Sequence, residues 1–160
     1  MSVRRAAAGL DAIEAVYRAR FDEFVRVARA ITGDAEAARD AVQEAFAAAV
    51  RNRRSYRGDG PLGAWLWRAV VNKARDAARA SRPPEGEPEA NGHGEDADHD
   101  VRALLALLPE RQRIAIFLRY YVDLDYSTIA EILEISEGTV AATLHAARTT
   151  LRRRLEEVLQ

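Results

Sequence analysis

The sequence predicts an all-α protein of two small helical domains joined by an acidic flexible linker. Three observations support this prediction. Apolar residues recur at three- and four-residue steps, without the alternation that is typical of strands. A tract rich in Pro, Gly and acidic residues interrupts this pattern at residues 83–100. Near the C-terminus, two helical patterns follow each other with a very short gap, which indicates a helix-turn-helix. The expected domains are therefore residues 10–82 and 101–160.

Composition excludes several classes of protein. Cysteine is absent, so disulfides, thiolate metal sites and a cysteine nucleophile are excluded, which suits a cytoplasmic protein. No run of 18 apolar residues appears, so we expect no membrane partner. Arg4 and Arg5 lie near the start, but no apolar stretch follows them, so no signal peptide is expected.

The net charge of −1 hides a strong partition along the chain. Residues 1–82 hold 16 Lys and Arg against 10 Asp and Glu. Residues 83–100 hold 7 acids and no Lys or Arg, and residues 101–160 hold 8 of each sign. The basic balance of the first domain favours attraction to phosphate, which the overall charge would not predict.

The first domain begins with two predicted helices. Residues 10–32 carry an apolar stripe, and Gly33 suits the position after a helix because it tolerates positive φ. Asp34 is expected to cap a second helix over residues 35–53. A basic cluster around Tyr56 follows, made of Arg51, Arg53, Arg54 and Arg57.

A loop and a third helix complete the first domain. Two glycines and Pro61 end the helical pattern after Tyr56, and Pro61 is expected to open a helix over residues 62–81. Aromatic residues beside arginines and an asparagine suit single-stranded nucleic acid, where bases stack on rings and cations hold phosphates. The alternative is a helix with Trp65 and Val70 in the core and a solvated basic face.

The linker at residues 83–100 contains no large apolar residue. It cannot bury enough surface to offset its ordering entropy, so we expect it to be disordered and extended. His93 and His99 lie here without a helical framework, so neither a metal site nor a cofactor is expected.

The second domain is predicted to hold helices over residues 101–108 and 110–121, separated by Pro109. Two further stripes follow, with Ser127 and Ser136 expected as their N-caps and Thr139 in the first turn of the longer helix. A short helix, a tight turn and a longer helix place the second helix in a DNA major groove. An ordinary helical hairpin is the alternative.

Taken in order, several segments resemble bacterial sigma factors of the extracytoplasmic-function (ECF) class, which keep sigma regions two and four. DAVQEAF at residues 40–46 resembles the DLVQEVF helix of that class, and YRGDGPLGAWLWR at residues 56–68 resembles its FRGD…WLYR stretch, which continues to Asn72 and Asp76. LPERQR at residues 108–113 resembles the start of region four. YSTIAEIL, GTV and LHAAR within residues 126–148 resemble its helix-turn-helix.

The resemblance implies a transcription initiation factor that binds core RNA polymerase and directs it to −10 and −35 promoter elements. The implied partners are the clamp of the largest polymerase subunit, the flap region, and promoter DNA both duplex and melted. An anti-sigma factor is a further implied partner, since factors of this class are often held inactive by one. The residues implied in polymerase binding are Asp40, Val42, Gln43, Glu44 and Phe46, of which Val42 and Phe46 are expected to be shared with the core.

The same resemblance assigns two DNA-binding sets. Residues implied in capturing the melted −10 strand are Tyr56, Arg57, Gly58, Asp59, Arg68, Asn72, Lys73 and Arg75. Residues implied in binding the −35 duplex are Arg119, Tyr126, Ser136, Glu137, Thr139, Thr143, His145 and Arg148.

The chain departs from the family pattern in its recognition helix. Ala141, Thr143 and Ala146 stand where many members have Lys or Arg, so arginine–guanine forks are missing and −35 recognition is expected to be weak or unusual. Glu134 stands at the usual turn glycine, and a positive φ there would cost about 1 kcal/mol.

The sequence leaves two other functions open and gives no sign of an enzyme. No enzyme is expected, because the sequence shows no Ser/His/Asp set, metal triad or phosphate loop. The main alternative is a stand-alone helix-turn-helix regulator that binds duplex DNA without polymerase. A protein-interaction module that has lost DNA binding is a third hypothesis, left open by the alanine-rich recognition helix.

Overall fold

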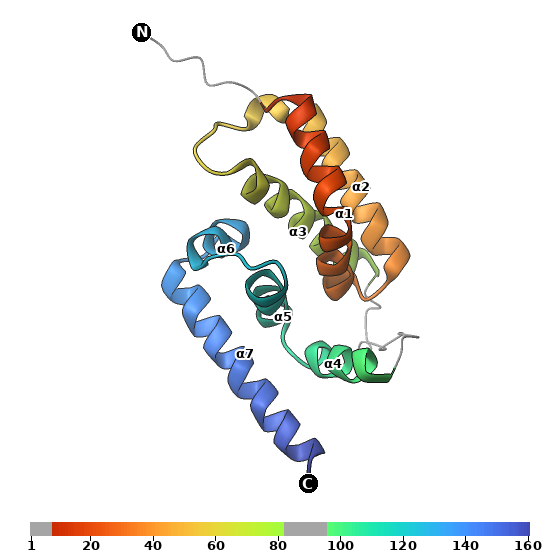
Figure 1. Ribbon diagram of the computed structural model, residues 1–160, viewed down its shortest axis with the longest axis vertical. Helices are drawn as coiled ribbons and strands as arrows, with labels where there is room; N and C mark the ends of the chain where they lie inside the picture. The colour runs from red at the N-terminus through yellow and green to blue at the C-terminus, as the bar shows by residue number, and fades with distance from the viewer. Residues whose placement is uncertain (1–7, 82–95) are drawn as a thin grey trace. The chain divides into compact units, whose positions relative to one another are not determined.

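The computed structural model describes residues 8–81 and 96–160, with the backbone alone for residues 96–100 (Figure 1). Within these ranges the regular elements are all helices, which confirms the predicted all-α class. The described residues form two compact units, the first of which ends at Ser81. No described helix is both long and apolar enough to cross a membrane.

The first unit is a bundle of α1 (Leu10–Thr32), α2 (Ala35–Arg51) and α3 (Leu62–Ser81), each packed on the other two. Its centre is a series of aromatic rings, in which the Phe24 centroid lies 4.2 Å from that of Trp67 and 5.1 Å from that of Phe46. Val42 of α2 is also fully buried. Burial of each such side chain contributes about 1.5–3 kcal/mol, so this centre holds the three helices together.

The turn between α1 and α2 follows the sequence prediction. Gly33 has φ 76°, and its N–H donates to the Arg29 carbonyl, which closes the last turn of α1. The Asp34 carboxylate accepts from the Ala37 N–H at 2.8 Å. Both predicted caps are therefore confirmed, and they fix the angle at which α2 returns along α1.

The connection from α2 to α3 differs slightly from the prediction. α2 ends at Arg51, two residues early, and a short 3-10 turn, η1 (Arg53–Ser55), leads into the loop. Within it, Gly58 has φ 71°. The Pro61 carbonyl accepts from the N–H groups of Ala64 and Trp65, so α3 begins directly after the proline, as predicted.

The second unit contains α4 (Asp96–Ala106), α5 (Glu110–Ile116), a π-helical turn η2 (Phe117–Tyr121), α6 (Tyr126–Leu133) and α7 (Glu137–Val158). α5 and α6 both pack on α7. The core is formed by buried aliphatic side chains: Ile114, Leu118, Ile129, Ile132, Val140 and Leu144. α7 extends well beyond the residues that α5 and α6 cover, and Leu155 and Val158 are exposed.

The α4–α5 connection corrects one prediction and explains a motif. α4 begins at Asp96, so residues 96–100 of the predicted linker are helical. Acidic residues in the first turn stabilise a helix by interacting with its dipole, which explains why this acidic segment can form the start of α4. Residues 82–95, with His93, lie outside the described residues. After Pro109 restarts the helix, Arg113 donates to the Leu108 carbonyl at 3.1 Å and holds the turn.

The helix-turn-helix is formed by α6, residues 134–136 and α7. Ser136 caps α7 as predicted, accepting from the Thr139 N–H at 3.1 Å. The predicted cap at Ser127 is wrong. Asp125 caps α6 instead, accepting from the Thr128 N–H at 2.7 Å, and Ser127 lies inside the helix. A carboxylate two residues earlier reaches the first-turn N–H groups, so the helix starts ahead of its apolar stripe.

In the turn before α7, the residue at the usual glycine position does have a positive φ. Glu134 has φ 57° and ψ 44°, the left-handed conformation that favours glycine. Asp123, in the connection before α6, has φ 63°. Both ends of α6 are therefore shaped by left-handed residues other than glycine, at about 1–2 kcal/mol each.

Candidate nucleic-acid interface

The outward side of α2 carries a short polar row. Asp40, Gln43 and Glu44 are exposed on one side of the helix, at the spacing that places side chains together. Val42 and Phe46, from the same predicted set, are 0% and 6% exposed. Both side chains hold α2 against the bundle, so the polar row is the exposed part of this set, and the sharing of Val42 and Phe46 with an interface stays a prediction.

An ion pair links the exposed row of α2 to α3. The Lys73 ammonium lies 3.3 Å from a Glu44 carboxylate oxygen. The Lys73 side chain is 34% exposed and that of Glu44 is 63% exposed, so this pair contributes no more than about 1 kcal/mol to stability. It does bring together a residue of the predicted polymerase set and one of the predicted −10 set.

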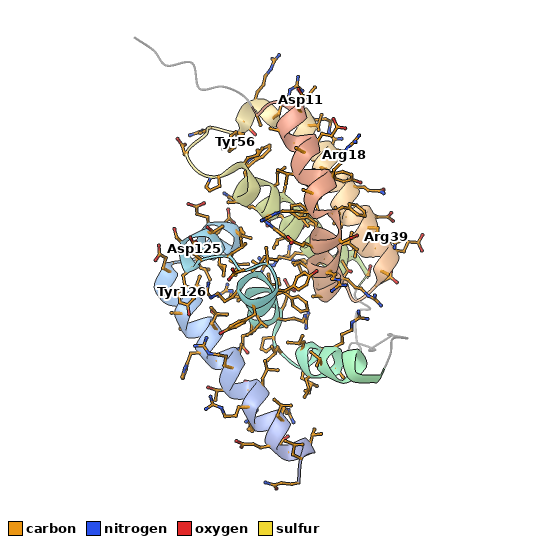
Figure 2. All side chains as sticks on the ribbon, in the orientation of Figure 1. Asp11, Arg18, Arg39, Tyr56, Asp125 and Tyr126 are labelled. Carbon is orange, nitrogen blue, oxygen red and sulfur yellow. The ribbon has the colours of Figure 1, made fainter. Side chains whose placement is uncertain are left out.

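The loop before α3 is held in shape by Tyr56 (Figure 2). Its hydroxyl donates to the Gly60 carbonyl at 2.5 Å, and its ring lies 5.4 Å from that of Trp65. Arg57, Gly58 and Asp59, between these anchors, are exposed. Tyr56 is therefore half-buried as a support for the loop, and the three following residues form its accessible tip.

The exposed side of α3 continues from this loop. Arg68 and Asn72 are exposed, and Lys73 and Arg75 are partly exposed, while Val70 and Val71 on the opposite side are buried. Val70 is thus a core residue, as one of the two interpretations expected, but Trp65 is half-buried against the loop. The eight predicted −10 residues lie on one loop and one side of one helix.

The first turns of α7 hold most of the predicted −35 residues, but several of their polar groups are already engaged. The Thr143 hydroxyl donates to the Thr139 carbonyl at 2.7 Å, and the Thr139 hydroxyl lies 2.8 Å from that of Ser136. Glu137 and His145 are exposed. His145 is thus the most accessible polar side chain in the middle of this face.

The remaining three predicted −35 residues are brought together from separate elements. The Arg119 guanidinium lies 5.4 Å from the ring centre of Tyr126 and donates to the Leu124 carbonyl at 3.0 Å. Arg148 of α7 donates to the Tyr120 hydroxyl at 2.7 Å. Hydrogen bonds to Tyr120 and Tyr126 raise the pKa of Arg148 above its ordinary value, so the group stays cationic.

Tyr120 was missed by sequence reasoning. It lies beside Arg119 in the predicted helix of residues 110–121, where the helical stripe gives no reason to single it out. Its position depends on the π-helical turn η2, which no residue pattern in this segment predicts. Among the described residues, no group of His, Asp or Glu side chains is arranged to hold a metal ion.

Comparison with known families gives two matches. Residues 16–83 match the family model described as "Sigma-70 region 2", and residues 98–151 match the one described as "Sigma-70, region 4". The chain is 32% identical to the RNA polymerase sigma-H factor of Pseudomonas aeruginosa, over 79% of this chain and 77% of that one. It is 31% identical to the ECF RNA polymerase sigma-E factor of Escherichia coli, over 76% and 75%.

Two solved structures are similar in fold. CnrH, in complex with the cytosolic domain of CnrY, aligns with a TM-score of 0.75 at 24% identity, covering 94% of this chain and 91% of that one. RpoE from Bartonella quintana, in complex with the anti-sigma factor NepR, aligns with a TM-score of 0.75 at 20% identity, covering 92% and 98%.

Proposed function

The chain belongs to the extracytoplasmic-function class of sigma-70 factors, which direct RNA polymerase in transcription initiation, and from this premise we propose how its surfaces divide the work. Residues 10–82 bind core polymerase and the −10 element, and residues 101–160 bind the −35 element. Factors of this family are initiation factors rather than enzymes. The chain acts in the cytoplasm, where polymerase and promoter DNA are found.

Polymerase binding is assigned to the polar row of α2, made of Asp40, Gln43 and Glu44. The row is exposed, while the apolar side of the same helix is fully committed to the bundle, so a partner meets only the polar groups. Its partner is the clamp of the largest polymerase subunit. The flap region is the proposed contact of the second unit.

Capture of the melted −10 strand is assigned to the loop tip and to the exposed side of α3. A base taken out of the stack needs a pocket edge with hydrogen-bonding groups, which Asp59, Asn72 and the loop backbone supply. Arg57, Arg68 and Arg75 supply cations for the phosphates. The observation that best supports this proposal is that Tyr56 ties the start of the loop to Gly60 and Trp65 near its end. The tip between them is therefore fixed in an exposed position before any ligand binds.

Binding of the −35 duplex is assigned to Ser136, Glu137, Thr139, Thr143 and His145 at the start of α7 and to the phosphate contacts Arg119, Tyr126 and Arg148. Because the hydroxyls of Thr139 and Thr143 bond locally, base readout by this face is weak. A large part of the −35 affinity comes from the DNA backbone and from polymerase tethering.

An anti-sigma factor is a further proposed partner. The two similar structures hold, by their own descriptions, a cytosolic domain of CnrY and the anti-sigma factor NepR.

Polymerase binding is tested by reversing a charge on the α2 row. Asp40→Arg should weaken capture of the chain by core polymerase by at least about 30-fold, whereas Asp22→Arg, an exposed change on α1, should have little effect. Transcription reconstituted with core polymerase on a promoter library then reads both elements. Sequence-specific binding to a duplex without polymerase, unchanged by Asp40→Arg, would instead favour a stand-alone regulator.

A further inference from the structure

Four side chains of the second unit meet on one surface. Arg119 and Tyr120 come from the π-helical turn η2, Tyr126 from the first residue of α6, and Arg148 from the middle of α7. We call these four residues the Tyr–Arg cluster. Tyr126 lies where α6 meets α7 (Figure 2). Tyr120 belongs to no predicted site, yet it is 57% exposed and is the residue that accepts from Arg148.

The backbone around the Tyr–Arg cluster is held by several specific bonds. The N–H of Val122 donates to the Phe117 carbonyl, which closes the π turn, and the N–H of Leu124 donates to the Leu118 carbonyl, both at 3.0 Å. Asp123, between them, is left-handed. Arg119 reinforces the connection through the Leu124 carbonyl. The two tyrosines are therefore placed by fixed backbone, and π turns of this kind recur at functional sites.

The chemistry of the contact leaves donors for an anion. A phenol that accepts from a guanidinium keeps its own O–H to donate, and a guanidinium carries five N–H groups in a planar fork. Hydrogen bonding to Tyr120 and Tyr126 favours the charged form of Arg148, and Arg119 lies over the Tyr126 ring. The nearby acid Asp125 accepts from Thr128 in the first turn of α6, and its charge also interacts with Arg119.

We propose that Tyr120 completes a site for a single DNA phosphate, in which its hydroxyl orients Arg148 and donates to a phosphate oxygen. Tyr126 and Arg119 form the other side of the site. This inference rests on the proposed duplex binding by the second unit and adds a residue to it. The site is sequence-independent, and it supplies affinity that the alanine-rich face of α7 lacks.

The test removes one oxygen atom. Binding of the full-length chain to a labelled random-sequence duplex of about 20 base pairs is measured by fluorescence anisotropy over a series of salt concentrations. Tyr120→Phe should weaken binding about five- to tenfold at low salt. Thr149→Ala, which removes an exposed hydroxyl bonded only to the His145 carbonyl among the contacts described, is the matched control and should change binding less than about twofold.

A double-variant cycle identifies the mechanism. Log affinity falls with log salt concentration, and Arg148→Ala should make this fall less steep by about 0.9, which corresponds to the loss of one phosphate contact. Tyr120→Phe should weaken binding less in that background than in the wild-type chain, because the tyrosine then has no guanidinium to orient and retains only its own hydrogen bond to the phosphate. Arg148→Lys should behave like Tyr120→Phe, since it keeps the charge but loses the fork.

Two outcomes would overturn the proposal: full additivity with Arg148→Ala, or wild-type affinity in Tyr120→Phe, whether the melting temperature of that variant is unchanged or lowered. Wild-type affinity with a lowered melting temperature would make the contact purely structural. Transcription by the reconstituted holoenzyme is scored separately. If Tyr120→Phe weakens duplex binding but the holoenzyme does not transcribe, the initiation role is refuted and the phosphate site is kept. If Tyr120→Phe changes neither duplex binding nor transcription, the phosphate site is refuted and the initiation role is kept.

Discussion

The two helices proposed to face nucleic acid, α3 and α7, present different surfaces. Over three turns α3 carries long polar or basic side chains at Arg68, Asn72, Arg75 and Arg79. The corresponding face in the first half of α7 carries shorter side chains. Ala142 and His145 are exposed there, and the Thr143 hydroxyl is bonded to the helix backbone. One helix thus carries its binding groups in its own sequence, and the other has few.

In the binding mode proposed above, the second unit compensates through tertiary structure. The cation in the middle of α7 is paired with a tyrosine that lies 28 residues earlier in the chain, and a second arginine comes from the same π-helical turn. A recognition surface can therefore be assembled from neighbours when the recognition helix lacks long cationic side chains. Variants of each surface test this difference between α3 and α7.

The largest effect is expected on the α3 side, from Tyr56→Ala. The change removes the ring contact with Trp65 and the hydrogen bond to Gly60, so the loop tip loses both supports. Opening of the −10 region by holoenzyme, measured by permanganate reactivity of unpaired thymines, should fall about 10- to 100-fold. Tyr56→Phe keeps the ring contact and should show a smaller loss. Equal opening by wild type and Tyr56→Ala would mean that the loop does not take part.

A gain of function on α7 should come next in size. Ala141→Arg places a long cation near the start of the recognition helix, where none exists, and should strengthen binding to a duplex carrying the −35 element about tenfold. Ala47→Arg adds the same charge on the exposed side of α2 and should give little gain. An equal gain from both changes would attribute the effect to net charge rather than to a missing recognition contact.

The turns that precede α2 and α7 give a matched pair for stability. Gly33 and Glu134 are both left-handed, with φ 76° and 57°, but only the first is glycine. Glu134→Gly should raise the free energy of unfolding of the second unit by about 1 kcal/mol, and Gly33→Ala should lower that of the first by a similar amount. Both tryptophans lie in the first unit, so tryptophan fluorescence follows Gly33→Ala and circular dichroism follows Glu134→Gly in urea. If both variants changed the free energy of unfolding in the same direction, the strain attributed to the left-handed conformation of Glu134 would be contradicted.

Local rules explain which features the sequence predicted. The α1–α2 turn was predicted correctly because glycine and aspartate act within a few residues of their own positions. The exposed row of α3 follows in the same way from helical periodicity. The cap at Ser127 was predicted wrongly because an earlier carboxylate reached the same N–H groups. The Tyr120–Arg148 contact was not predictable, since it depends on a π turn and on two elements meeting in space.

The smallest effects are expected from side chains at the centre of the recognition face. Thr143→Ala should change binding to the −35 duplex less than about twofold, because its hydroxyl is already bonded to the Thr139 carbonyl. His145→Ala removes an exposed ring that is proposed to contact the major groove, and it should weaken binding to the −35 duplex about three- to fivefold. Comparison of a selected promoter with a scrambled −35 sequence separates base readout from backbone affinity. If His145→Ala weakens binding to both sequences equally, α7 contributes contacts without sequence discrimination. The −35 specificity of this chain would then come from DNA shape, and the phosphate contact proposed for the Tyr–Arg cluster would add affinity alone.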